Sequence, residues 1–210
     1  MKVAVVGANG RAGFLIVKEA IERGLDVTAF IRSGENRTLA KKAVKKDLFS
    51  LTKEDLKGYD AVVDALGAWT AETVNDIYLA VQHLCDILSG SDTRLLVVGG
   101  AGSLYVNSKH TACVADGPDF PDTFKPVAKV HDIALKNLRE RKDVKWTYIS
   151  PACDFQAEGE RTGKYLLGGE ELILNERGES IISYADYAIA MVDELIAGTH
   201  ICRRISVVRK

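Results

Sequence analysis

The sequence predicts an α/β fold: a doubly wound parallel sheet with a small cap region near the C-terminus. Three observations predict it. The chain opens on a β-branched run, residues 3–6, that breaks into three glycines spaced three apart, Gly7, Gly10 and Gly13. Strand-like apolar runs then alternate with helical patterns as far as Pro151, which is the rhythm of strand–helix–strand units. After Pro151 the rhythm gives way to a stretch rich in glycine and charge.

The first unit is the clearest. The β-branched residues 3–6 suit a buried parallel strand that Gly7 ends. Apolar side chains at helical spacing, among them Phe14, Val17 and Ile21, predict a helix over residues 11–23. Strand, glycine turn and helix in this order form the setting of a Rossmann dinucleotide-binding loop.

Short apolar runs predict the later strands, and longer amphipathic patterns predict the helices between them. The strands are expected over residues 27–31, 43–45, 61–65, 95–98 and 146–149, with helices over 72–88 and 127–141 and a shorter one near 53–57. Right-handed crossovers make the sheet doubly wound, with helices on both faces. Its ligand is expected beyond the carboxyl ends of the strands.

The C-terminal part adds a cap, residues 152–182, to this sheet. The cap contains two short strands that could pair, 165–167 and 172–174. A helix over 184–197 and a last strand over 205–208 follow it. Ser183, with Asp186 three residues later, is an acidic form of the capping box that opens a helix. No repeat or long linker separates these parts, so residues 1–210 are expected to form one domain.

The composition is that of a globular protein. The 210 residues are 47% hydrophobic and 27% charged, with a formal net charge of -1, which favours neither a nucleic-acid nor a membrane partner. The four cysteines and four histidines lack the short spacings of a zinc site, so no metal is expected and the thiols are expected to be free. Without a signal-peptide pattern or an apolar run of membrane-spanning length, a cytoplasmic location is expected.

The glycine loop supplies the first predicted binding residues. A glycine at the first position permits the tight turn, at the second it lets backbone approach a pyrophosphate, and at the third it allows close helix packing. The helix N-terminus then faces the phosphates, where its free N–H groups favour negative charge. The predicted loop residues are Gly7, Asn9, Gly10, Arg11, Ala12 and Gly13.

The end of the second predicted strand favours one cofactor. A protein that prefers NAD usually has a carboxylate there for the ribose 2′-OH, whereas this chain has Arg32 and Ser33. A guanidinium suits a 2′-phosphate, so NADP(H) is preferred over NAD(H), the alternative being a solvated loop arginine. At the next strand ends, Asp47 and Leu48 could border the adenine, and Leu66 and Gly67 could let backbone lie against the dinucleotide. Each of these also reads as an ordinary turn.

Several motifs together carry a family resemblance. They are the GxxGxxG loop, Arg32, Asp47, Val-Asp-Ala-Leu-Gly67, Val-Val-Gly-Gly-Ala-Gly-Ser103 and Trp-Thr-Tyr-Ile-Ser150-Pro151-Ala152. This set resembles the atypical short-chain dehydrogenase/reductase superfamily. The later Gly-Glu-Arg161-Thr-Gly and Asp186-Tyr-Ala segments are similar to the NADH-flavin reductase group of NAD(P)H-binding, NmrA-like proteins, which is related to biliverdin reductase B. The resemblance spans nearly the whole chain and implies a Rossmann fold with a nicotinamide cofactor.

The resemblance also implies where the chemistry takes place. Ser150, Pro151 and Ala152 should border the nicotinamide, although a proline there also simply ends a strand. Standard members use Tyr-x-x-x-Lys, whose tyrosine passes a proton to or from a substrate hydroxyl. The helix expected to carry it has no tyrosine, and the one match, Tyr105 with Lys109, comes several residues too early. We interpret that match as a chance one.

The missing dyad favours an acceptor that needs no positioned acid. A flavin accepts hydride at N5 and can take its proton from water, so a diffusible flavin or a quinone is the predicted small-molecule substrate. Ser103, Lys129 and His131 are the candidate catalytic groups, with a surface position at a helix start as the alternative for His131. Arg161 is the predicted substrate contact in the cap, with an ion pair between cap and core as its alternative.

Other functions stay open from the sequence. The main rival is a redox-sensing regulator that binds NADP(H) and catalyses little, as related proteins with the same loop and no dyad do. Sugar epimerases and dehydratases need the missing tyrosine. A serine hydrolase is disfavoured because neither Ser103 nor Ser150 lies in GxSxG. The physiological acceptor and the oligomeric state do not follow from the sequence.

Overall fold

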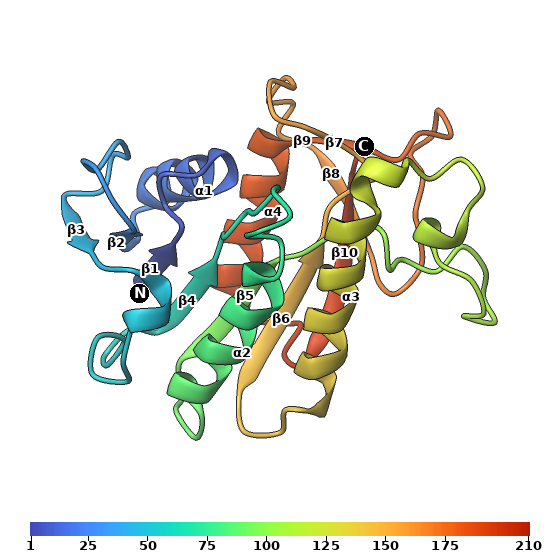
Figure 1. Cartoon of the computed structure of the whole chain (residues 1–210). Coiled ribbons are helices and arrows are strands. Elements are labelled where there is room, and N and C mark those ends of the chain that lie inside the picture. The colour runs from blue at the N-terminus through green and yellow to red at the C-terminus, as the bar shows by residue number, and fades with distance from the viewer.

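The computed structural model describes all 210 residues, Met1 to Lys210. Its centre is an eight-stranded sheet in the order β3-β2-β1-β4-β5-β6-β10-β8, with helices on both faces (Figure 1). Every neighbouring pair in this sheet is parallel except β10 with β8, which is antiparallel. The predicted doubly wound, Rossmann-type fold is therefore confirmed.

The elements follow one another along the chain in the alternation that the sequence predicted. The strands of the large sheet are β1 (Lys2–Val6), β2 (Asp26–Ile31), β3 (Lys42–Lys45), β4 (Ala61–Asp64), β5 (Arg94–Val98), β6 (Lys145–Ser150), β8 (Tyr165–Gly168) and β10 (Arg203–Arg209). The helices are α1 (Arg11–Glu22), α2 (Asp76–Leu88), α3 (Lys125–Glu140) and α4 (Tyr184–Ala197). A separate parallel pair is formed by β7 (Asp154–Gln156) and β9 (Ile181–Ser183), which the sequence analysis missed.

Two apolar layers hold the sheet between the helices. In β1, Val3 and Val5 belong to the core that α1 and α4 cover, whereas Ala4 and Val6 belong to the core under α2 and α3 (Figure 1). Burial on both faces explains why these strands read as continuous apolar runs. No helix combines the length and apolar character needed to cross a membrane.

Some expected elements are wrong. Residues 165–167 and 172–174 do not pair with each other: the first lie in β8, which pairs with the edge of β10, and the second are not a strand. An open sheet edge offers a row of unpaired backbone groups, and β8 satisfies them. Residues 53–57 form turns, because so short a segment gains too few hydrogen bonds to nucleate a helix. The second long helix begins at Asp76, since turns occupy residues 72–75.

The start of α4 fulfils half of its predicted capping box. The Ser183 hydroxyl accepts a hydrogen bond from the Asp186 backbone N–H at 3.0 Å, as expected. The Asp186 carboxylate does not return the bond. It accepts from the Thr162 hydroxyl at 2.6 Å and from the Gly163 backbone N–H at 2.8 Å. This buried carboxylate therefore anchors the cap to the core.

Candidate functional site

Two cavities lie along the carboxyl edge of the parallel strands. The loop cavity, of about 540 Å³, collects the ends of β1, β2, β3 and β4 and the glycine loop. The aromatic cavity, of about 600 Å³, lies where β5 and β6 end, below the cap. Both volumes fall in the usual range for small-molecule sites, and the edge is where doubly wound sheets bind their ligands.

The glycine loop has no room for side chains. Gly7 adopts a left-handed φ of +74°, and a Cβ there would lie 2.8 Å from the Ala65 carbonyl oxygen. A Cβ on Gly13 would collide with the Gly7 carbonyl, so this glycine lets α1 pack on the loop. Gly10 is the N-cap residue of α1, and no side chain caps the helix. The first N–H groups of α1 are therefore free to bind an anion such as a pyrophosphate.

Basic side chains gather beside this loop. Arg32 and Ser33 line the loop cavity at the end of β2, joined there by Arg37 and Lys46. The Arg37 guanidinium donates to the Asn9 carbonyl at 3.0 Å, and Lys46 pairs with a carboxylate at 2.6 Å. Arg32 is exposed and forms no hydrogen bond or ion pair. It is thus the cation of this cavity that is free to meet a phosphate.

Asn9 ties the glycine loop to the segment after β2. Its side-chain NH₂ donates to the Glu35 carbonyl at 2.8 Å, and its side-chain oxygen accepts from the Arg37 backbone N–H at 3.0 Å. Asn9 therefore positions the loop that Arg32 flanks. The predicted residues Arg11 and Ala12 lie in the first turn of α1 and do not line the loop cavity.

The ends of β3 and β4 contribute the other predicted cofactor residues. Asp47, Leu48, Leu66 and Gly67 all line the loop cavity. The Asp47 carboxylate accepts from the Phe49 backbone N–H at 2.9 Å and so caps the short 3₁₀ turn η1 (Leu48–Ser50). This bond fixes the orientation of Leu48, which is buried.

A buried carboxyl group supports the turn after β4. Asp64 is 3% exposed, and burial raises its pKa to about 7. Its Oδ1 accepts a hydrogen bond from the Leu66 backbone N–H at 3.1 Å. Asp64 thus holds the chain where it passes along the loop cavity.

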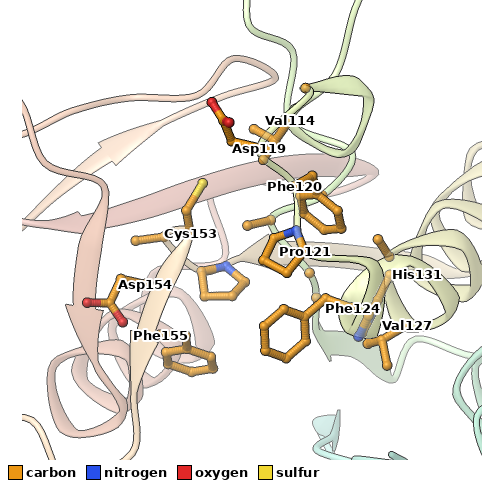
Figure 2. A pocket seen from close by; sticks show the side chains of 18 of the residues that line it. Val114, Asp119, Phe120, Pro121, Phe124, Val127, His131, Cys153, Asp154 and Phe155 are labelled. Atoms are coloured by element: carbon orange, nitrogen blue, oxygen red, sulfur yellow. The ribbon is translucent and has the colours of Figure 1, made fainter.

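Aromatic rings and prolines from distant segments form the aromatic cavity. Its rings are Trp69 after β4, Phe120 and Phe124 before α3, Phe155 in β7 and Tyr184 at the start of α4. Figure 2 shows Phe120, Pro121 and Phe124 on one side, with Cys153, Asp154 and Phe155 on the other. Phe155 lies against Tyr184, with the ring centroids 3.9 Å apart. Such a lining favours a flat, apolar ligand.

His131 lines this cavity as a neutral group. Burial lowers its pKa to about 4, so the imidazole is uncharged at pH 7. Its Nδ1 is 3.1 Å from the Tyr148 hydroxyl oxygen, which itself accepts from the Gly100 backbone N–H at 3.0 Å. A Cβ on Gly100 would lie 2.9 Å from the imidazole ring. The glycine-rich end of β5 therefore makes room for His131.

The other predicted catalytic and substrate residues do not reach this cavity. The Ser103 hydroxyl accepts from the Arg204 guanidinium at 3.0 Å, and Lys129 is exposed on α3. Arg161 forms an ion pair of 2.8 Å with Glu19 of α1, the alternative that the sequence left open.

The end of β6 lies at the aromatic cavity. Pro151 and Ala152 line it, while Ser150 is fully buried and its hydroxyl has no hydrogen-bond partner. Tyr105 and Lys109 lie elsewhere. The Tyr105 ring stacks on His110 at 4.2 Å between centroids.

The sequence analysis missed Arg37 and the aromatic lining. A signal was present in residues 117–126, where two phenylalanines stand among prolines after the fifth strand. A loop at the carboxyl end of a central strand is a usual place for ligand contacts. Arg37 had no such signal, because its approach to Asn9 depends on the path of the loop after β2.

Known proteins match this chain along its whole length. A protein of Streptococcus pneumoniae described as a "putative NADH-flavin reductase" is 51% identical, with a TM-score of 0.97 and full coverage of both chains. The uncharacterised protein YwnB of Bacillus subtilis is 42% identical over 99% of this chain and 98% of its own. The anaerobillin reductase ChuY of Escherichia coli O157:H7 shares the fold, with a TM-score of 0.73 at 15% identity and coverage of 100% and 97%.

The family comparison agrees with the geometry of the glycine loop. The model of a family described as NAD(P)H-binding matches residues 7–196, from the first glycine of the loop to the end of α4. The chain therefore belongs to the NAD(P)H-binding family.

Proposed function

We propose that this protein is a reductase that prefers NADPH to NADH and passes a hydride to a flavin or a quinone-like acceptor. One observation carries the proposal: an aromatic cavity opens at the ends of β5 and β6, on the same sheet edge as the glycine loop. The description of the Streptococcus pneumoniae protein as an NADH-flavin reductase supports a flavin as the acceptor.

The loop cavity fits the nucleotide part of the cofactor. Gly7, Gly10 and the uncapped start of α1 would hold the pyrophosphate, and Arg32 would pair with the 2′-phosphate. Pro151 and Ala152 would border the nicotinamide, which supplies a hydride from its C4 when bound. Two electrons and one proton thus go to N5 of an oxidised flavin, and a second proton comes from water to complete the dihydroflavin.

The residues of the aromatic cavity act by orientation. Trp69, Phe124 and Phe155 present flat apolar faces that stack on a planar acceptor and exclude water from it. His131 remains neutral and offers one hydrogen bond through Nε2, because Nδ1 faces Tyr148. The one tyrosine in this lining is Tyr184 and no lysine stands beside it there, so the proposal relies on an acceptor that can take its proton from water.

The test is turnover measured on the purified protein. With NADPH and riboflavin under anaerobic conditions, we expect loss of NADPH absorbance and bleaching of the flavin in equal amounts. NADPH deuterated at C4 should slow the reaction when hydride transfer limits the rate. Tight NADPH binding with no turnover of any flavin or quinone would contradict the proposal and favour the redox-sensing regulator.

Tyr105 offers a second check on the mechanism. Its ring stacks on His110 outside the aromatic cavity, so it has no access to the acceptor. We expect Tyr105→Phe to leave kcat and KM for riboflavin unchanged. A large loss of kcat with unaltered folding would show that the Tyr105/Lys109 match is a working dyad.

A further inference from the structure

The charges of the two cavities differ in sign. The ionisable side chains that line the aromatic cavity are Asp119, His131, Cys153, Asp154 and Tyr184, with no lysine or arginine among them. Since the imidazole is neutral and both carboxylates are exposed, the lining carries two negative charges and no positive one at pH 7. The loop cavity instead contains Arg32, Arg37 and Lys46 against two aspartates.

Basic side chains near this cavity lie outside its lining. Lys125 and Lys129 lie in the first turns of α3, yet neither lines the aromatic cavity. The Lys125 ammonium is held by Asp122 at 2.6 Å. Arg11, at the start of α1, also stays outside the lining, and its positive charge lowers the pKa of Tyr184 by less than burial raises it.

The two carboxylates come from different walls. Asp119 belongs to the loop before α3, beside Phe120, whereas Asp154 opens β7, beside Phe155 (Figure 2). One Asp154 oxygen accepts from the Gln156 side-chain NH₂ at 2.9 Å, which holds it on the cap side. Both carboxylates thus lie at the exposed edge of the cavity, and Figure 2 shows them turned away from the rings.

We infer that the aromatic cavity accepts an uncharged planar aromatic molecule and discriminates against the same ring system when it carries a phosphate or sulfonate. This inference rests on the proposed reductase function and names its substrate class. Riboflavin or an uncharged naphthoquinone fits the rings and meets no repulsion. FMN brings a phosphate with a charge of about -1.5 to -2 to a lining that has no cation to pair with it.

The expected preference for riboflavin over FMN should depend on the salt concentration. Exposed charges act over a Debye length of about 30 Å at 0.01 M ionic strength and about 3 Å at 1 M. We expect riboflavin to exceed FMN in kcat/KM by roughly 3- to 10-fold at low salt, with a ratio near one at high salt. A preference set by shape alone would not fall with salt.

The experiment compares two matched pairs of acceptors, riboflavin with FMN and 1,4-naphthoquinone with its 2-sulfonate. Equilibrium binding to the NADP⁺-loaded protein is followed by fluorescence quenching, so that affinity is measured without turnover. Steady-state rates with NADPH are then measured for the same four compounds. The uncharged member of each pair should bind more tightly and show the higher kcat/KM.

Variants identify the source of the discrimination. Asp119→Asn combined with Asp154→Asn keeps the size and one acceptor oxygen of each side chain while removing both charges, and should lower the riboflavin-to-FMN ratio of both affinity and kcat/KM. The control combines Glu158→Gln with Glu160→Gln, two exposed cap residues outside the lining, and should leave the ratio unchanged.

The outcomes separate the two proposals. The charge selection is overturned if FMN is used as well as riboflavin or better. It is also overturned if the riboflavin-to-FMN ratio changes neither with salt nor in the aspartate variants. Both results leave the reductase function in place. If none of the four compounds binds or is reduced, the proposed function fails, and the inference fails with it.

Discussion

Arg32 and Arg37 line the same cavity but differ in what holds them. The Arg37 guanidinium is occupied by the Asn9 carbonyl, and Arg32 has no partner. A charged group without a partner can give its full interaction to a ligand, whereas a held group must first lose its existing bond. The side chain that decides between NADPH and NADH should therefore be Arg32.

Replacing Arg32 with alanine tests this assignment. Arg32→Ala should raise the Kd for NADPH about tenfold, equivalent to one charge-assisted hydrogen bond, and leave the Kd for NADH nearly unchanged. Titration calorimetry with both cofactors measures the two constants. Lys41→Ala, an exposed change outside the loop cavity, is the matched control for lost positive charge. Equal weakening of both cofactors would reject the 2′-phosphate contact.

Asp64 should make the stability of the protein depend on pH. Burial raises its folded-state pKa from an ordinary 3.8 to about 7, so the folded protein favours the protonated carboxyl. The contribution of this group to the free energy of unfolding is therefore fully present below pH 3.8 and is lost as the pH rises through 7. Asp64→Asn keeps the acceptor for the Leu66 N–H and has no charge to bury. Urea unfolding should show little difference at pH 4 and a variant more stable by about 1–4 kcal/mol at pH 8. A difference independent of pH would contradict the raised pKa.

At the scale of elements, the start of α1 depends on one close backbone contact. Gly13 lies so near the Gly7 carbonyl that a Cβ has no space, because the helix must pack directly on the loop that precedes it. The same contact aims the free N–H groups of α1 at the cavity. Packing and anion binding are thus properties of a single junction.

A glycine substitution tests how much this contact contributes to stability and to cofactor affinity. Gly13→Ala should lower the free energy of unfolding by about 1–3 kcal/mol through overpacking and weaken NADPH and NADH alike. Gly169→Ala is the control, since a Cβ there meets nothing within 4 Å and its φ is not positive. Unchanged stability and affinity in Gly13→Ala would show that the loop can move aside.

At the scale of the whole molecule, the cap is fastened to the core by polar contacts on α1 and α4. Arg161 pairs with the buried Glu19 of α1, and Asp186 of α4 binds the segment next to it. These contacts hold residues 159–163 against the core. The same cap supplies Phe155 and Asp154 to the aromatic cavity, so its seating shapes the acceptor site.

Arg161→Ala separates this structural role from the predicted substrate contact. We expect a loss of about 0.5–1 kcal/mol in unfolding free energy, small because the arginine is half exposed. The KM for riboflavin should stay within about twofold, equivalent to about 0.4 kcal/mol, since Arg161 does not line the aromatic cavity. Arg177→Ala, an exposed cap variant, controls for charge. A large rise in KM with unchanged stability would support the substrate contact that the sequence predicted for Arg161.

The sequence by itself determined the sheet, its crossovers and the glycine loop, because these depend on local periodicity and on backbone positions that only glycine fills. It also brought Arg32, Asp47 and Gly67 to one cavity, since parallel strands end at one edge. Only the tertiary structure decided that Ser103 and Arg161 are held by Arg204 and Glu19, and that Phe120 meets Phe155 across a cavity. Such contacts join segments far apart in the chain, and no local pattern encodes which ones meet.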